Sequence, residues 1–239
     1  MSEKNQPEEH APWEKEIDEI HTRRKLAKQQ GGKAAVDKHH EKGRLTIRER
    51  IDTLLDTKSF QEIGEGAGVP EYDDNGKLKD FQPANFILGF GQIEGRKVIV
   101  GGEDFTVRGG SPNPAGLRKS VYTEQLALKY KVPLIRLHEG GGGSVGGTGN
   151  DKARRPLGDP VFSESRFVPL AETLSSIPVA TAALGPVAGL PAARLVASHF
   201  SVMTPNAAVL IAGPQVVKRA TGHDMTKEEL GGPQVHLAS

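Results

Sequence analysis

Two hydrophobic segments of this chain each run directly into a glycine-rich turn, and this pairing constrains the fold more than any other feature. The first segment is 132–137, followed by the turn 138–147; the second is 179–184, followed by the turn 185–190. Glycine lets the backbone adopt positive φ and lets a ligand approach the main chain closely. A turn that opens a helix directs unpaired N–H groups toward such a ligand. Two such turns side by side would hold a developing oxyanion without any charged side chain.

The composition excludes several classes of site and partner. The 239 residues suffice for one large domain or two small ones, and the absence of cysteine excludes disulfides and thiolate metal sites. A net charge of +1 gives no argument for a nucleic-acid partner or a membrane surface. No apolar stretch approaches the roughly 20 residues of a membrane helix. The acidic start of the chain fits neither a secretory signal nor a transit peptide, so a cytoplasmic protein is expected.

The N-terminal quarter is polar and predicted to be helical. Residues 1–12 are expected to form a disordered tail, and 13–30 a helix whose narrow apolar stripe suits an arm lying on another surface. Thr46 and Glu49 match a capping box, which predicts a further helix over 46–55.

The next part of the chain carries turn signals and short β patterns. Its glycines and proline predict a loop over 64–82. A hairpin is predicted from 86–93 and 97–100, with a further short strand at 104–107.

Beyond residue 110, helix and strand patterns alternate. Helices are predicted over 115–130, 163–176 and 188–197 and from 216 onward, and strands over 132–137, 179–184, 202–203 and 209–211. The alternation indicates an α/β fold with parallel strands and right-handed crossovers. The glycine-rich stretch 138–160 is irregular, and a loop of this length inside a compact domain is usually functional or mobile.

The first glycine turn admits three interpretations. Gly142, Ser144 and Gly146 satisfy the G-x-S-x-G pattern of a serine nucleophile, but the glycines that follow cannot open the helix that this motif requires. The segment could instead be only a flexible loop. The favoured interpretation is that the turn presents backbone N–H groups to a ligand.

Metal binding has little support in the sequence. His138 and Glu139 could indicate a metal site or a general base, but no further ligand lies at helical spacing, and no metal is expected. Residues 39–41 lie in a polar linker and are expected to be solvated.

A second anion site is weakly indicated before the helix at 115–130. Arg108, Gly109, Gly110 and Ser111 form a possible anion cradle there. The turn 185–190 is the stronger candidate, because strand, tight turn and helix start follow one another in the order that an oxyanion site requires.

Four segments, taken together and in order, resemble a known family. They are Lys42–Ile51, Asp104–Ser111, Ile211–Gly222 and Glu228–Gly232. They are similar to segments of the carboxyltransferase (beta) subunits of biotin-dependent acyl-CoA carboxylases, such as the propionyl-CoA and methylcrotonyl-CoA carboxylase beta chains. The resemblance runs from about residue 13 to the end of the chain.

This resemblance implies a crotonase-like fold of ββα units, an acyl-CoA substrate similar to propionyl-CoA, and carboxyl transfer from carboxybiotin to the acyl α-carbon. It implies two kinds of partner: a biotin carboxylase/biotin carrier (alpha) subunit, and the C-terminal carboxyltransferase domain of a dimer-related subunit in a homo-oligomer. The expected domains are the tail 1–12, a helical arm over 13–60 and a crotonase-like domain over 61–239. That domain would be the N-terminal half of the family's subunit, as a fragment or a separately encoded half.

The resemblance also assigns site residues. Ala188, Gly189 and Leu190 match the family's Ala-Gly-Gly turn, whose backbone N–H groups steady a reacting carbonyl oxygen, and Gly142 and Gly143 match the partner loop. The predicted oxyanion donors are therefore the N–H groups of Gly142, Gly143, Gly189 and Leu190. Ala188 and the segment Arg108–Ser111 are predicted substrate contacts.

Departures from the family pattern, at Leu190, at Ser144, and in the segments 146–148 and 112–116, leave the substrate open and allow a divergent or inactive member. Leu190 replaces a glycine, so its side chain crowds the pocket, and Ser144 stands where an arginine is common. In the implied mechanism the amides stabilise an enolate and the biotin nitrogen takes the α-proton. Two rival functions remain: a crotonase-like hydrolase or decarboxylase that uses Ser144 or Glu139, and a non-catalytic assembly subunit whose arm 13–30 docks a partner.

Overall fold

The computed structural model describes residues 13–142, 165 and 167–237. Its helices are α1 (Glu14–Ala27), α2 (Lys33–His40), α3 (Ile47–Leu54), the short 3-10 helix η1 (Arg108–Gly110), α4 (Pro114–Tyr130), α5 (Phe167–Ser176), α6 (Leu190–Val196), α7 (Pro214–Thr221), α8 (Lys227–Gly231) and α9 (Pro233–Leu237). Its strands are β1 (Gln61–Glu62), β2 (Gly68–Tyr72), β3 (Leu78–Pro83), β4 (Phe86–Ile93), β5 (Arg96–Glu103), β6 (Leu134–Gly140), β7 (Val179–Ala188), β8 (Phe200–Met203) and β9 (Ala208–Leu210).

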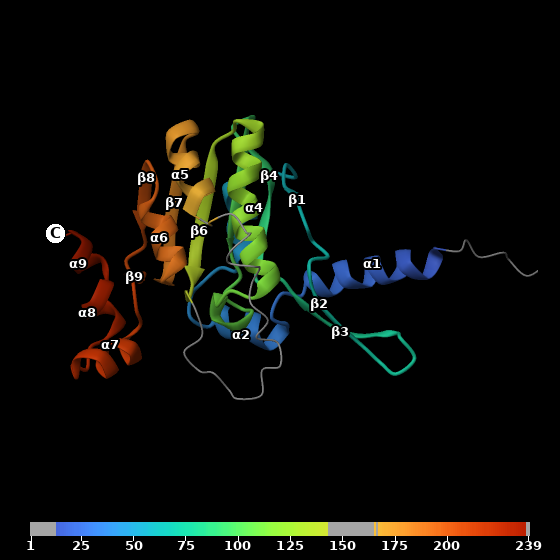
Figure 1. Ribbon diagram of the computed structural model, residues 1–239, viewed down its shortest axis with the longest axis horizontal. Helices are drawn as coiled ribbons and strands as arrows, with labels where there is room; N and C mark the ends of the chain where they lie inside the picture. The colour runs from blue at the N-terminus through green and yellow to red at the C-terminus, as the bar shows by residue number, and fades with distance from the viewer. Residues whose placement is uncertain (1–12, 143–164, 166, 238–239) are drawn as a thin grey trace, which may run out of the picture.

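One seven-stranded sheet organises the described part of the chain (Figure 1). Its strand order is β1-β4-β5-β6-β7-β8, and β9 also pairs with β7. The pairs formed by β1, β4 and β5 are antiparallel, whereas every pair from β5 through β9 is parallel. The predicted α/β fold with parallel pairing is therefore confirmed, and the parallel part carries both glycine turns.

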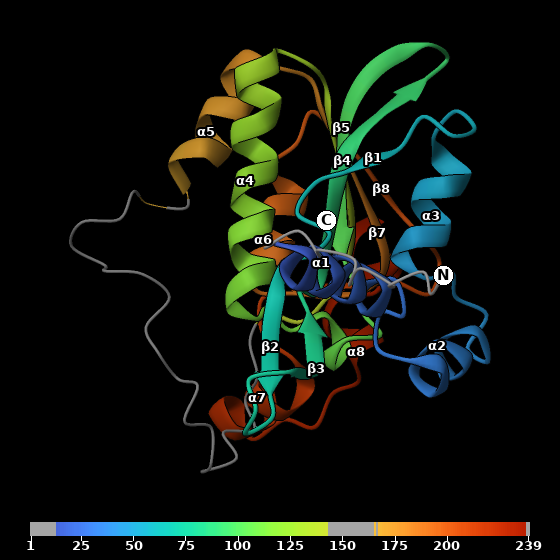
Figure 2. The same ribbon diagram turned by 90° about the vertical axis from the view of Figure 1, so that its right-hand side faces the viewer.

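Helices cover both faces of the sheet (Figure 2). On one face lie α4 and α6, with α5 beside α4, and on the other face lies α3. Figure 1 shows α1 projecting at one end of the molecule and α7, α8 and α9 at the opposite end. None of the helices in the described ranges is long and apolar enough to span a bilayer.

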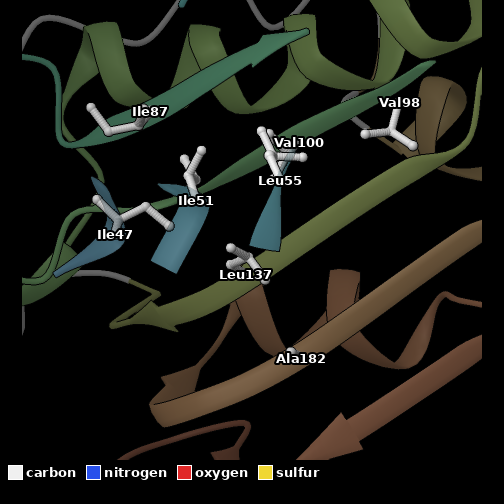
Figure 3. Close-up of a cluster of buried hydrophobic side chains, with 8 residues drawn as sticks. All are labelled: Ile47, Ile51, Leu55, Ile87, Val98, Val100, Leu137 and Ala182. Carbon is white, nitrogen blue, oxygen red and sulfur yellow. The ribbon is translucent and has the colours of Figure 1, made fainter. Parts of the chain in front are cut away.

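Two hydrophobic cores flank the sheet. The core under α3 consists of Ile47, Ile51, Leu55, Ile87, Val98, Val100, Leu137 and Ala182 (Figure 3). The core under α4 consists of Phe86, Leu88, Ile99, Leu126, Ala127, Leu134, Ile177 and Val179. Along β5, Val98 and Val100 face α3 while Ile99 faces α4, so this strand is buried on both sides, as central strands of α/β sheets are.

Local sequence signals placed several elements correctly. The predicted capping box exists: the Thr46 N–H donates to Glu49 Oε2 at 2.7 Å, and the Glu49 N–H donates to Thr46 Oγ1 at 3.4 Å. The predicted hairpin is the pair β4–β5, joined at Glu94 and Gly95, both with positive φ.

Three predictions differ from the structure. The expected loop 64–82 contains the hairpin β2–β3, which the pattern concealed because Phe81 is the one buried side chain in its strands. The expected strand 104–107 is a turn, since the Asp104 carboxylate accepts hydrogen bonds from both the N–H and the hydroxyl of Thr106. Residues 39 and 40, predicted to lie in a linker, are the last two residues of α2.

Candidate active site

The glycine turns that end β6 and β7 touch each other. The two strands are parallel neighbours, and Gly140 of β6 pairs with Val187 of β7. A methyl group added to Gly142 would lie 2.5 Å from the Cα atom of Gly189 and 2.6 Å from the carbonyl oxygen of Ala188. Both distances are far inside van der Waals contact, so the two backbones approach this closely only because the side chains are absent.

The amide nitrogen of Leu190 lies at this junction. Gly189 has φ 66° and ψ −127°, a positive-φ conformation that favours glycine and that turns the chain from β7 into α6. The Leu190 nitrogen would lie 3.0 Å from a methyl group added to Gly142. No described residue accepts a hydrogen bond from the Leu190 N–H, so this donor is available to a ligand.

The neighbouring amides differ in this respect. The Gly189 N–H donates to the carbonyl oxygen of Leu210 in β9 at 3.0 Å, so Gly189, a predicted donor, is already satisfied within the chain. The Gly141 N–H donates to the Gly109 carbonyl oxygen at 3.3 Å. For the Gly142 N–H no acceptor exists among residues 13–142, 165 and 167–237. The junction therefore offers one available amide from each turn, at Gly142 and Leu190.

Two residues named by the sequence lie outside the described residues. They are Gly143, a predicted oxyanion donor, and Ser144, the candidate nucleophile.

The segment Arg108–Ser111 packs against the end of β6, next to the first glycine turn. The Gly110 N–H donates to the Val107 carbonyl at 3.1 Å, and the Ser111 N–H donates to the Arg108 carbonyl at 3.2 Å. A methyl group added to Gly110 would lie 2.6 Å from the Cα atom of Gly140. Two amides of the predicted anion cradle are thus satisfied internally, and its backbone packs against the end of β6.

Arg108 itself lines a different cavity, of about 460 Å³. This cavity lies between the residues that follow α1 and the β2–β3 hairpin, and none of its lining residues belongs to either glycine turn. Glu71 and Asp80, which pair across the hairpin, both line it. Their carboxylates make this cavity a poor phosphate site, and the assignment of Arg108 as a substrate contact stays a prediction.

Glu139 is fully buried and faces the N-terminal arm. Its Oε1 atom lies 3.0 Å from Nη1 of Arg44, and its Oε2 atom lies 2.5 Å from Nη2 of Arg50. Because both carboxylate oxygens contact guanidinium groups of the arm, this side chain is a structural link between the arm and β6. The geometry argues against Glu139 as a general base.

His39 completes this cluster, which corrects the expectation that residues 39–41 are solvated. His39 is 4% exposed, and its Nε2 atom lies 3.1 Å from the Leu45 carbonyl oxygen and 3.5 Å from Oε2 of Glu139. Burial lowers the pKa of His39, and the charge of Glu139 only partly opposes this effect. His40 and Glu41 are exposed as expected.

His138 points to the opposite face of β6 from Glu139, as the alternation of a strand requires. His138 is buried, and its Nδ1 atom lies 3.0 Å from Oε2 of Glu103 at the end of β5. Burial by itself would raise the pKa of Glu103, but the charge and hydrogen bond of His138, a backbone hydrogen bond and the charge of Arg194 together lower it.

A buried ionic cluster joins the elements that carry the two turns. Oε1 of Glu124 in α4 accepts from Nη2 of Arg136 in β6 at 2.8 Å and from Nε of Arg194 in α6 at 2.8 Å. Burial lowers the pKa of Arg136 to about 10, although the charge of Glu124 opposes this. Sequence reasoning missed the cluster; its signal was a charge between two apolar residues of a strand, Ile135 and Leu137.

The cavity beside the junction is small. It measures about 20 Å³, and its lining includes Glu103, Gly110, Leu190 and Arg194. This volume holds about one water molecule, so it is too small to hold an acyl-CoA. In the part of the chain that the structure describes, no three His, Cys, Asp or Glu side chains come together as a possible metal site.

Comparison with known proteins shows which family and which proteins this chain is similar to. The carboxyl transferase domain model matches residues 38–239. The whole chain aligns with 32% identity to the methylmalonyl-CoA carboxyltransferase 12S subunit of Propionibacterium freudenreichii subsp. shermanii, and covers 44% of it. Over 91% of its length the chain is 33% identical to the propionyl-CoA carboxylase beta chain of Saccharopolyspora erythraea, and covers 39% of it.

A solved structure agrees with these matches. This structure is the transcarboxylase 12S hexamer, solved with methylmalonyl-coenzyme A and methylmalonic acid bound. It superposes on this chain with a TM-score of 0.71 at 28% identity. The superposition covers 92% of this chain and 42% of that one. The likeness confirms the crotonase-like fold that the sequence resemblance implied. The chain spans about two fifths of the length of these relatives.

Proposed function

Because the chain belongs to the carboxyl transferase domain family, we propose that it forms one half of an acyl-CoA carboxyltransferase site. The reaction moves a carboxyl group from carboxybiotin to the α-carbon of an acyl-CoA similar to propionyl-CoA. The named relatives support this substrate class, since one is a propionyl-CoA carboxylase beta chain and another a methylmalonyl-CoA carboxyltransferase subunit.

The observation that carries the proposal is the contact between Gly142 and the Gly189–Leu190 turn. In the proposed mechanism the thioester carbonyl oxygen accepts hydrogen bonds from the N–H groups of Gly142 and Leu190. When the α-proton leaves, negative charge moves onto this oxygen, and the fixed amides stabilise the enolate. Removal of one oxyanion donor of this kind typically raises the barrier by about 2.7–4 kcal/mol.

Of the sites predicted from sequence, Gly142 and Leu190 remain proposed donors and Gly143 remains a candidate. Gly189 is no longer a proposed donor, because its N–H donates to the carbonyl oxygen of Leu210. Its proposed role is to turn the chain from β7 into α6 through its positive φ. Ala188 remains a proposed substrate contact, since its carbonyl oxygen lines the junction.

Carboxybiotin, carried by a partner domain, supplies the carboxyl group and a nitrogen that accepts the α-proton. The chain's own part is to bind and orient the thioester. This division suits the described side chains, because the carboxylates closest to the end of β6 are engaged: Glu139 contacts two guanidinium groups and Glu103 contacts His138.

The remainder of the site is proposed to come from other polypeptide. A C-terminal carboxyltransferase domain of a dimer-related subunit would face the junction within a homo-oligomer, and a biotin carboxylase/biotin carrier subunit would deliver the carboxyl group. Within this chain, the proposed division is an arm over 13–60 and a carboxyltransferase domain over 61–239. In support of this boundary, α1, α2 and α3 end before residue 60 and β1 begins at Gln61.

The experiment that tests the proposal removes one N–H. Leu190→Pro deletes the amide donor at the first position of α6, where proline is tolerated. Leu190→Ala is the matched control, because it removes the side chain and keeps the N–H. The assay is incorporation of radiolabelled bicarbonate into propionyl-CoA by the natural assembly, purified through a tag on this chain.

We expect Leu190→Pro to lower kcat by about 10²- to 10³-fold, and Leu190→Ala to stay within severalfold of the unmodified protein. Equal activity of all three proteins would refute the assignment of this amide. Acyl-CoA hydrolysis by the chain without biotin would favour the hydrolase instead, and failure to bind CoA in calorimetry within an intact oligomer would favour the assembly subunit.

A further inference from the structure

We propose that Arg136 is a positioning residue that sets the separation between the Gly142 and Leu190 amides. This inference rests on the proposed function, since it concerns how the same junction is built. Arg136 touches neither amide and acts through the elements that carry them.

Arg136 links the two elements directly. It belongs to β6, which leads into the turn with Gly142, and its guanidinium reaches α6, which begins at Leu190. Its Nη1 atom donates to the carbonyl oxygen of Arg194 in α6 at 3.3 Å, and to that of Ala197, the residue that caps the C-terminal end of α6, at 3.4 Å. The guanidinium of Arg136 on β6 therefore binds the C-terminal end of α6, the helix that begins at the second glycine turn.

Glu124 fixes the direction of this guanidinium. Its Oε1 atom lies 2.8 Å from both Nη2 of Arg136 and Nε of Arg194, so α4, β6 and α6 meet at one oxygen atom. All three side chains are at most 3% exposed, and water does not compete for these hydrogen bonds. A displacement of α6 along β6 would break several of these bonds together, which makes their relative position well defined.

The need for such a restraint is visible at the junction itself. Gly142 and Gly189 are in backbone contact, so there are no side chains there to interlock and hold a register. α6 is also short, with seven residues. Its placement therefore depends on contacts further along the helix: the hydrogen bonds from Arg136 to two carbonyl oxygens, and the ion pair of Arg194 with Glu124.

Stability alone does not explain the cluster. Replacing a buried ionic triad by apolar residues of similar volume is often neutral or stabilising. A guanidinium differs from such residues, and from lysine, in offering several donors in a fixed planar fork. This directional property is what the proposal assigns to Arg136.

The test compares two arginine-to-lysine variants in the tagged natural assembly. Arg136→Lys keeps the charge and removes the fork. Arg48→Lys is the matched control, because Arg48 likewise uses two guanidinium nitrogen atoms, both bonded to Glu62 at 2.7 Å and 3.1 Å, but between α3 and β1. We expect Arg136→Lys to lower kcat for propionyl-CoA carboxylation by about 10- to 100-fold with KM nearly unchanged, and Arg48→Lys to leave both unchanged.

A second variant keeps the test decisive if Arg136→Lys folds poorly. A triple variant replaces the cluster by apolar side chains, with Glu124→Leu, Arg136→Met and Arg194→Leu. This variant should unfold at a temperature close to that of the unmodified protein, while its kcat remains low. Unchanged kcat in either variant, with its fold intact, would overturn the inference. If the unmodified assembly does not carboxylate any acyl-CoA, the proposed function fails first, and the two failures are thereby distinguished.

Discussion

Replacing Gly142 by alanine should push the two glycine turns apart. The added methyl carbon would lie 2.5 Å from the Cα atom of Gly189, whereas carbon atoms in contact lie about 3.5 Å apart. The turns must therefore separate by about 1 Å, because the opposing atoms belong to the backbone and cannot rotate away. A misplacement of about 1 Å at a reacting centre can cost about 10²-fold in rate.

The assay is again acyl-CoA carboxylation by the tagged assembly, with kcat and KM measured separately. Gly66→Ala is the control, because nothing lies within 4 Å of a methyl group there and Gly66 is not among the positive-φ glycines. We expect Gly142→Ala to lose about 10²-fold in kcat and Gly66→Ala to lose nothing. Full activity of Gly142→Ala, with its fold confirmed by circular dichroism, would refute the reasoning that the spacing of these turns controls the reaction.

Three further predictions concern stability. Glu139→Gln should lower the free energy of unfolding by about 3–5 kcal/mol, because it leaves the partly buried guanidinium groups of Arg44 and Arg50 without their carboxylate. Denaturant titration measures this, and a loss below 1 kcal/mol would contradict it. Thr46→Ala should cost about 1 kcal/mol through the lost cap of α3, and an unchanged denaturation midpoint would argue against the cap's role. The pKa of Glu103 is lowered in the folded state, so the ionised carboxylate stabilises the fold above its unfolded pKa of about 4.3. This stability is lost as the pH falls through the folded-state pKa. Glu103→Gln should therefore flatten this part of the acid-unfolding curve, and an unaltered curve would count against the prediction.

Local patterns predicted the elements whose residues carry their own signals. Thr46 and Glu49 marked the start of α3, and the apolar runs at 86–93 and 97–100 marked the central hairpin. The hairpin β2–β3 was missed because it buries little, and α2 was missed because its exposed residues mask one buried side chain, His39.

At the candidate site, too, the sequence predicted the features that local patterns carry and missed those that depend on the fold. The sequence located the ends of both strands to within a few residues, since their hydrophobic patterns are clear. However, β6 continues through Gly140 and β7 through Ala188, into segments that were predicted as turns. The sequence could not show that the Gly189 N–H is bonded to Leu210, because that acceptor lies in a different strand and is brought there by the sheet topology. Nor could it pair Glu124, Arg136 and Arg194, which come from three elements far apart in the chain.

A structure of the natural assembly with propionyl-CoA bound would test the central claim most directly. The account predicts that the thioester carbonyl oxygen lies within about 3.2 Å of the amide nitrogen atoms of both Gly142 and Leu190. A carbonyl oxygen bound by side chains elsewhere, with both of these amides directed away from it, would contradict the account.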